Sequence, residues 1–355
     1  MKVAFAIRTN YLEVKGGDTF QLLKTKEYLE RDWNCDVTVV TSPEELQHNS
    51  YELMHVFNLQ TTDFTLKMVR AAKENGIKVF LSPIMWHFGD SRYVNRASRL
   101  TCNFNVISSF KFISTISEKL SIREGYAQRK EIIDNCNAIL PNSVEEGEIV
   151  NTVFHSAVPV FVVPNCVDLG LKQSEADISL PKNIILEVGR IEPTKNQLVV
   201  ILALMKHRDI PLYFVGQQNP IKQHYIDYVK TLAAVRGNTY FVEDVPQADL
   251  IAYYKAAKVH VLPSFRESPG LVTLEAMYYD TNVVVSSKNY CPISYYQLDK
   301  YGYVCNPFSK ISVEKAIMSA YKEEIKKAPD EYFNFIHYKN AAKLTYKAYL
   351  TVLKQ

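Results

Sequence analysis

The sequence of 355 residues lacks the features that would hold a metal ion or cross a membrane. It contains no Asp-x-Asp pair and no Cys or His residues at the spacing of metal ligands, so we expect neither a metal site nor a cofactor. No apolar run approaches the roughly 20 residues that a membrane-spanning helix needs. Basic side chains number 41 and acidic ones 38, a balance that argues against a nucleic-acid partner.

The six cysteines are scattered and form no Cys-x-x-Cys pair. Scattered cysteines of this kind are typical of reduced thiols in a cytoplasmic protein. The chain opens with Met1 to Ile7, a short apolar segment that predicts a strand and not a secretory signal peptide. We therefore expect a cytoplasmic protein.

Short apolar segments alternate with helical segments along the chain, which is typical of parallel α/β sheets. Its length suggests about two domains. In the first half, strands are expected at 3–7, 37–41, 53–57, 78–82, 137–142 and 159–163. In the second half, they are expected at 184–188, 212–216, 239–243, 259–262, 282–286 and 303–307. The pattern predicts a doubly wound architecture in both halves.

Residues 263–277, Pro-Ser-Phe-Arg-Glu-Ser-Pro-Gly-Leu-Val-Thr-Leu-Glu-Ala-Met, are the most informative stretch. They follow a predicted strand, Pro269 and Gly270 mark a turn, and a helix is expected from Leu271 to Tyr279. A proline such as Pro269 suits the first position of a helix, where its missing N–H is harmless. The free N–H groups of Gly270, Leu271 and Val272 would then favour an anion, most naturally a phosphate. Gly270 would also let that anion approach the backbone closely.

Two carboxylates flank this turn, Glu267 in the loop and Glu275 in the helix. Glu275 lies four residues after Leu271, so both share a helical face. A carboxylate does not bind phosphate, but it accepts hydrogen bonds from the hydroxyls of a ribose or a sugar beside the phosphates. The arrangement indicates a nucleotide-sugar. The alternative is that both glutamates are ordinary solvated side chains.

A second loop carries cations that suit a diphosphate. Residues 189–196, Gly-Arg-Ile-Glu-Pro-Thr-Lys-Asn, follow a predicted strand. The guanidinium of Arg190 and the ammonium of Lys195 can both reach a diphosphate and would stabilise its charge as it departs. The alternative is a pair of solvated loop cations.

These motifs resemble those of the family 4 retaining glycosyltransferases, which have the GT-B fold. Residues 263–277 resemble the family's Glu-x7-Glu signature, and residues 189–196 its Gly-Arg-x4-Lys-Asn motif. Gly16 and Gly17 resemble the glycine pair that the family places beside the donor phosphates, although a plain helix-entry turn would also use them. Residues 163–168 resemble the family's Val-Pro-Asn-Gly-Val-Asp, with Cys166 in place of glycine.

The resemblance implies two Rossmann-like doubly wound domains facing a central cleft. The acceptor-side domain is expected at 1–165 and the nucleotide-sugar-binding domain at 166–335, while residues 336–355 return to the first. It also implies a retaining transfer of a sugar from a nucleotide-diphosphate sugar to an acceptor hydroxyl, in cell-surface polysaccharide or glycolipid biosynthesis. Two alternatives stay open: another GT-B enzyme, such as a sugar phosphorylase or a nucleotide-sugar epimerase, and a non-catalytic regulatory subunit that binds a nucleotide-sugar.

By this resemblance, the expected catalytic residues are Arg190, Lys195, Glu267 and His87. The expected donor-binding residues are Gly16, Gly17, Gly270, Leu271, Val272 and Glu275. His87 lies in a loop where family members carry a His or Asp that contacts the donor sugar, and the alternative is a half-buried loop histidine.

Basic side chains outnumber acidic ones between residues 90 and 130, and aromatic residues lie among them. Such a surface can contact an anionic membrane peripherally. The resemblance adds that a sugar or lipid-linked saccharide acceptor docks in this part of the chain. A solvated helical pair packed on its aromatic residues is an equally good interpretation.

Overall fold

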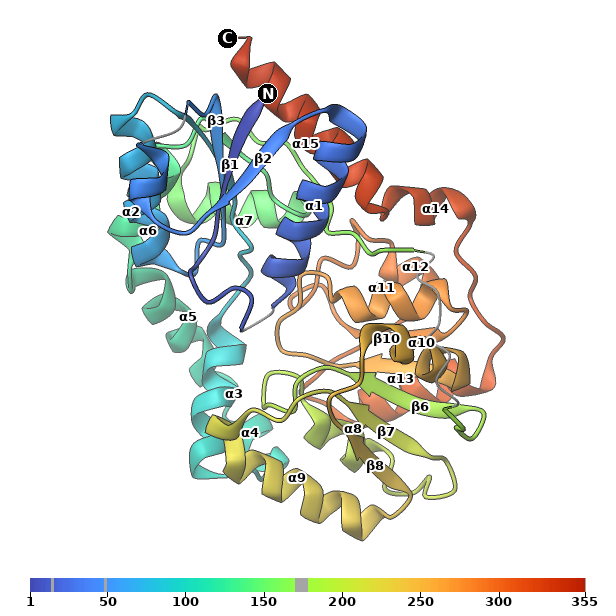
Figure 1. The fold of residues 1–355 in the computed structure, drawn as a ribbon. Coiled ribbons are helices and arrows are strands. Elements are labelled where there is room, and N and C mark those ends of the chain that lie inside the picture. Colours follow the sequence, from blue (N-terminus) through green and yellow to red (C-terminus); the bar gives the residue numbers. More distant parts are fainter. Residues whose placement is uncertain (14–15, 48–49, 170–177, 355) are drawn as a thin grey trace. The chain divides into compact units, whose positions relative to one another are not determined.

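The computed structural model describes residues 1–13, 16–47, 50–169 and 178–354. They form two compact units, each built on one parallel sheet with helices on both faces (Figure 1). The first unit comprises Met1–Trp86, Ile122–Asp168 and Glu331–Gln355, and the second comprises His87–Ser121 and Leu169–Asp330.

The first sheet has the strand order β2-β1-β3-β4-β5. Its strands are β1 (Lys2–Ala6), β2 (Asp36–Val40), β3 (Leu53–Phe57), β4 (Lys78–Ser82) and β5 (Ala138–Ile139). Its helices are α1 (Gly17–Trp33), α2 (Thr62–Glu74), α6 (Tyr126–Asp134), α7 (Val144–Phe154) and α15 (Tyr338–Leu353), and η1 (Pro43–Leu46) is a short 3₁₀ turn. The inner strands β1, β3 and β4 are largely apolar and buried, as parallel strands covered on both faces must be, whereas the edge strand β2 exposes Asp36 and Thr38.

The last helix, α15, packs on α1 in the first unit (Figure 1). The rings of Trp33 and Tyr346 stack between these helices with centroids 4.8 Å apart. The hydroxyl of Tyr349 lies 2.6 Å from Nδ1 of the buried His55 on β3. Helix α15 therefore contributes to the core of this unit, from the far end of the chain.

One predicted strand of the first unit is wrong. Residues 159–163 form an isolated bridge, between Val160 and Ile139, in place of a strand. Pro159 begins this segment and Pro164 follows it, and neither has the N–H that would extend a ladder.

The second sheet has the strand order β11-β10-β9-β6-β7-β8. Its strands are β6 (Ile184–Val188), β7 (Leu212–Val215), β8 (Thr239–Val242), β9 (Ala257–Leu262), β10 (Asn282–Ser286) and β11 (Tyr303–Cys305). Its helices are α3 (Gly89–Leu100), α4 (Phe104–Ser109), α5 (Ile113–Arg123, whose last two residues fall in the first unit), α8 (Gln197–Ala203), α9 (Gln223–Arg236), α10 (Gln247–Ala256), α11 (Leu271–Tyr278), α12 (Leu298–Tyr301) and α13 (Lys310–Lys322). A 3₁₀ turn, η2 (Pro220–Lys222), precedes α9, and α14 (Asp330–Phe335) begins where the chain returns to the first unit.

Two layers of helix cover the second sheet. Apolar residues of α8, α9 and α13 form one core with Ile185, Phe214 and Val261 of the strands. Helices α10 and α11 cover the opposite face (Figure 1). On that face the ring of Tyr254 on α10 packs edge-on against that of His260 on β9.

Residues His87–Ser121 pack with the second unit, whereas the sequence placed them in an N-terminal domain at 1–165. The reason is a cluster of buried apolar side chains that joins helices α3 and α4 to three distant loops, made of Tyr93, Val94, Ile107, Phe265, Tyr290 and Phe308. Hydrogen bonds add to it: Asn95 Nδ2 donates to Thr194 Oγ1 at 2.8 Å, and Ser108 Oγ donates to the Phe308 carbonyl at 2.7 Å. A boundary drawn along the sequence cannot show such contacts.

Candidate functional site

In each sheet the chain order reverses once, between β1 and β3 in the first unit and between β6 and β9 in the second. At such a point the loops that follow the two strands lead away from each other and leave a crevice at the carboxyl edge. Ligands of open α/β sheets bind in that crevice. The residues that follow β1, β3, β6 and β9 are therefore the places to look for a site.

The loops that follow β6 and β9 meet through an ion pair. The ammonium of Lys195 contacts the carboxylate of Glu267, across 72 residues of sequence. The backbone also joins the two loops, because the Phe265 N–H donates to the Thr194 carbonyl at 2.8 Å. Asn196 Nδ2 donates to the Pro263 carbonyl at 3.2 Å. Two motifs that are distant in sequence thus form one cluster at the reversal point of the second sheet.

Arg190 lies in the same turn as Lys195. Its guanidinium contacts Glu192 Oε1 at 3.4 Å, and 60% of its side chain is exposed, so solvent and an incoming anion can reach it. The turn packs closely on the end of β7. A Cβ atom at Gly216 would lie 2.3 Å from the Gly189 carbonyl oxygen, so a side chain at position 216 would displace the turn that carries both cations.

Helix α11 begins at Leu271, and Gly270 precedes it with a φ of 90°, a backbone conformation that favours glycine. Pro269 therefore lies before the helix and not at its first position, because this left-handed residue must intervene. A Cβ atom at Gly270 would lie 3.3 Å from Glu267 Oε2, which places the Glu267 carboxylate beside the helix start. The first N–H groups of any helix lack carbonyl partners within it, and those of Leu271 and Val272 are in this position.

The Glu275 carboxylate has protein donors on both oxygens. The Tyr254 hydroxyl donates to Oε2 at 2.8 Å, and Gln247 Nε2 donates to Oε1 at 3.3 Å. Burial raises the pKa of Glu275, and the two hydrogen bonds oppose that rise. Both donors come from α10, so this helix fixes the position of the carboxylate on α11.

A second buried carboxyl group lies beneath the turn that carries Arg190 and Lys195, which we call the cationic turn. Sequence reasoning missed this group. Glu187, in the middle of β6, is fully buried. Its Oε1 accepts a hydrogen bond from Gln197 Nε2 at 2.7 Å, and that same amide nitrogen lies 3.2 Å from the Arg190 carbonyl. Burial raises the pKa of Glu187 well above its usual value, although the nearby Lys195 charge opposes the rise. The available signal was a single charged residue in the apolar run Ile184–Val188.

Replacing Glu187 by glutamine is expected to change how stability depends on pH. The folded protein keeps the proton on Glu187 at pH values where an unfolded chain, with a pKa near 4.5, has lost it. The free energy of unfolding therefore falls as pH rises above about 4.5, until the folded pKa is reached. Denaturant unfolding from pH 5 to 8 should show that Glu187→Gln gains stability relative to the unaltered protein as pH rises. Parallel curves would contradict this.

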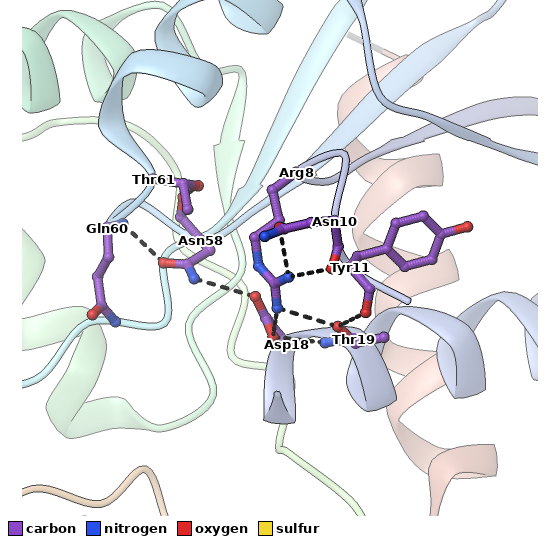
Figure 2. Close-up of polar contacts among 8 residues, drawn as sticks. All are labelled: Arg8, Asn10, Tyr11, Asp18, Thr19, Asn58, Gln60 and Thr61. Atoms are coloured by element: carbon purple, nitrogen blue, oxygen red, sulfur yellow. Dashed lines mark hydrogen bonds and ion pairs between the residues drawn. The ribbon is translucent and has the colours of Figure 1, made fainter. Parts of the chain in front are cut away.

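The reversal point of the first sheet carries a polar cluster centred on Asp18 (Figure 2). The Asp18 carboxylate accepts hydrogen bonds from the Arg8 guanidinium at 3.2 Å, from the Thr19 N–H at 2.9 Å and from Asn58 Nδ2 at 3.3 Å. Arg8 follows β1 and Asn58 follows β3, so one carboxylate joins both strand ends to the start of α1. Arg8 also donates to the carbonyl and side chain of Asn10 at 3.2 and 3.1 Å. Sequence reasoning missed this cluster, because a charged residue near a strand end carries no local signal of its partners.

The glycine pair lies at the start of α1. Gly16 is its N-cap, and Gly17 is its first residue. A Cβ atom at Gly16 would lie 2.7 Å from Asp18 Oδ1, so a side chain there would disturb the Asp18 cluster. The pair therefore allows the helix to begin directly against that carboxylate.

His87 is exposed at the start of the second unit. Its Nδ1 lies 3.5 Å from Glu118 Oε1 on α5. The expected contact between His87 and the donor sugar stays a prediction.

Within the described residues, no group of three or more His, Cys, Asp or Glu side chains is arranged to hold a metal ion. Over the same residues, no helix is long and apolar enough to span a membrane.

The two doubly wound sheets match solved structures over their full length. Sucrose-phosphate synthase from Thermosynechococcus elongatus superimposes with a TM-score of 0.76 at 15% identity, covering 100% of this chain and 99% of that one. The chain has the GT-B fold. HepE from Anabaena, solved in complex with UDP, gives a TM-score of 0.66 at 16% identity and covers 100% and 98% of the two chains. The expectation of two Rossmann-like doubly wound domains is thereby confirmed.

Part of the chain also matches a known protein family by sequence. Residues 172–337 match the family described as "Glycosyl transferases group 1". The matched segment contains Arg190, Lys195, Glu267 and Glu275. The D-inositol 3-phosphate glycosyltransferase of Corynebacterium diphtheriae is 25% identical over 186 residues, which are 46% of this chain and 43% of that protein. The similarity thus spans less than half of that relative.

Proposed function

We propose that this protein is a retaining glycosyltransferase of family 4 that moves a sugar from a nucleotide-diphosphate sugar to an acceptor hydroxyl. The observation that carries the proposal is the Lys195–Glu267 pair beside the start of α11. This cluster lies at the reversal point of the second sheet and inside the segment that matches the glycosyltransferase family. Cations and helix N–H groups suit the diphosphate, and carboxylates suit the hydroxyls on either side of it.

In the proposed reaction, the bond between the anomeric carbon and the diphosphate oxygen breaks, and its electron pair leaves with the diphosphate. Arg190, Lys195 and the N–H groups of Leu271 and Val272 stabilise the charge that develops there. The acceptor oxygen bonds to the same face of the sugar, and its proton passes to the departing phosphate oxygen. Glu267 and Glu275 hold hydroxyl groups of the sugar and the ribose, while His87 contacts the donor sugar.

The acceptor is proposed to be a sugar or a lipid-linked saccharide, as used in cell-surface polysaccharide or glycolipid biosynthesis. The Asp18 cluster, at the reversal point of the first sheet, provides polar groups for a hydroxylated ligand. Gly16 and Gly17 are proposed as donor-binding residues. For a lipid-linked acceptor, we propose that the protein is cytoplasmic and works peripherally at the inner face of a membrane.

A panel of nucleotide-sugars, each incubated with the protein with and without simple sugar acceptors, tests the proposal. Release of nucleoside diphosphate with formation of an α-linked product from an α-linked donor is the expected result. A sugar phosphorylase would require inorganic phosphate as the second reactant, and an epimerase would release no acceptor-linked product. A regulatory subunit would bind nucleotide-sugar without turnover, which thermal shift against the same panel would reveal.

Turnover is expected to persist in excess EDTA. Arg190, Lys195 and the start of α11 supply positive charge to the diphosphate, and the nearby carboxylates are assigned to hydroxyls. Magnesium requires carboxylate oxygens in addition to phosphates. The measurement is the initial rate in 10-fold excess chelator over contaminating metal, with and without added magnesium or manganese. Loss of turnover that either metal restores would overturn the charge assignment.

A further inference from the structure

Helix α5 (Ile113–Arg123) has its apolar side chains on the outside. Its buried face carries Ser117 and Ser121, while Ile116 and Leu120 are exposed. A surface helix normally shows the opposite arrangement, with apolar residues toward the core. The inward face is small and polar for a local reason: a Cβ atom at Gly89 would lie 2.7 Å from the Ser114 carbonyl oxygen, so α5 packs closely on the start of α3.

The exposed apolar side chains form one continuous stretch of chain. They run from α4 through the following turn to α5 and comprise Val106, Phe110, Phe112, Ile113, Ile116 and Leu120. Ile113, Ile116 and Leu120 are three and four residues apart, so they share one side of α5. Phe112 is 65% exposed and Ile116 57%. Soluble surfaces rarely gather so many large apolar groups unless a partner covers them. We name these six residues the α4–α5 patch.

Exposed cations border the α4–α5 patch. Lys111 and Lys119 are exposed beside it, and Arg123 occupies the last turn of α5. The acidic residue of this helix, Glu118, faces inward, where Oε2 accepts hydrogen bonds from the backbone N–H groups of Phe88 and Gly89. An apolar face bordered by exposed cations is complementary to a partner that has an apolar interior and an anionic surface.

We propose that the α4–α5 patch is a membrane-docking surface that inserts its apolar side chains between the lipids of an anionic bilayer. Phe112 and Ile116 enter the acyl boundary, and Lys111 and Lys119 contact the lipid phosphates. This inference deepens the proposed function by naming the surface that would bring the protein to a lipid-linked acceptor. Vesicle binding does not depend on turnover, so the two proposals can fail separately.

Co-sedimentation with vesicles tests the surface. The full chain is expected to bind vesicles containing 30% phosphatidylglycerol and to bind pure phosphatidylcholine vesicles at least tenfold more weakly. The double variant Phe112→Ser/Ile116→Ser should lose at least tenfold in partitioning onto the anionic vesicles. Lys111→Glu/Lys119→Glu should lose at least tenfold as well, with its apolar residues intact.

The matched control is Ile221→Ser/Ile311→Ser, which removes apolar side chains that are 83% and 71% exposed elsewhere on the second unit. This control should bind as the unaltered protein does, and all variants should keep the unaltered melting temperature. The proposal is overturned if no vesicle binding occurs, if both vesicle types bind equally, or if the patch variants bind normally. Self-association that the patch variants abolish, without vesicle binding, would assign the patch to a second copy of the chain and would also overturn it.

Discussion

Replacement of Lys195 by alanine is expected to lower kcat by about 10²- to 10³-fold, the usual loss when one preorganised group that stabilises developing charge is removed. The KM for the donor should change less, because charge on the departing diphosphate is greater in the transition state than in the bound donor. Arg190→Ala should act in the same way. Steady-state kinetics with varied donor at saturating acceptor measure both quantities.

Two further variants separate catalysis from structure at this position. Lys195→Ala leaves the Glu267 carboxylate without its ion-pair partner, so the double variant Lys195→Ala/Glu267→Gln shows whether that uncompensated charge causes the loss. The double variant should remain at least as slow as Lys195→Ala. Lys310→Ala, at an exposed position, serves as the control and should be unaffected. A change confined to KM would show that the cations bind only the ground state.

Replacement of Glu275 by alanine is expected to weaken the binding of a nucleoside diphosphate by about 10- to 150-fold. That range corresponds to about 1.5–3 kcal/mol for a hydrogen bond to a charged group. Titration calorimetry with UDP and with GDP provides the measurement. The loss should appear with the free diphosphate, without the sugar, because Glu275 is assigned to the ribose.

Tyr254→Phe tests whether the hydrogen bond from Tyr254 positions the Glu275 carboxylate for binding. This variant removes the hydroxyl that donates to Glu275 Oε2 but leaves the carboxylate in place. It should weaken binding less than Glu275→Ala, since Gln247 still holds the other oxygen. Unchanged affinity of Glu275→Ala for both diphosphates would refute the ribose assignment.

The elements themselves were predictable because hydrophobic periodicity is local. The apolar runs at 184–188 and 282–286 are strands β6 and β10 with those same bounds. The helix expected from Leu271 begins there, because Gly270 marks its start. The strand predicted at 159–163 was wrong for a reason that is also local: Pro159 and Pro164 have no N–H to extend a ladder, and a single bridge forms there.

The sequence by itself determined the strand and loop that carry each motif, and with them the GT-B fold. Only the tertiary structure decided which loops meet. Lys195 reaches Glu267 because β6 and β9 are neighbours in the sheet, and strand order depends on packing between distant segments. For the same reason, only the structure shows that the Asp18 carboxylate accepts hydrogen bonds from both Arg8 and Asn58. Only the structure shows, too, that Glu187 is buried beneath the cationic turn. Burial is a property of the assembled chain, whereas periodicity is a property of a few residues.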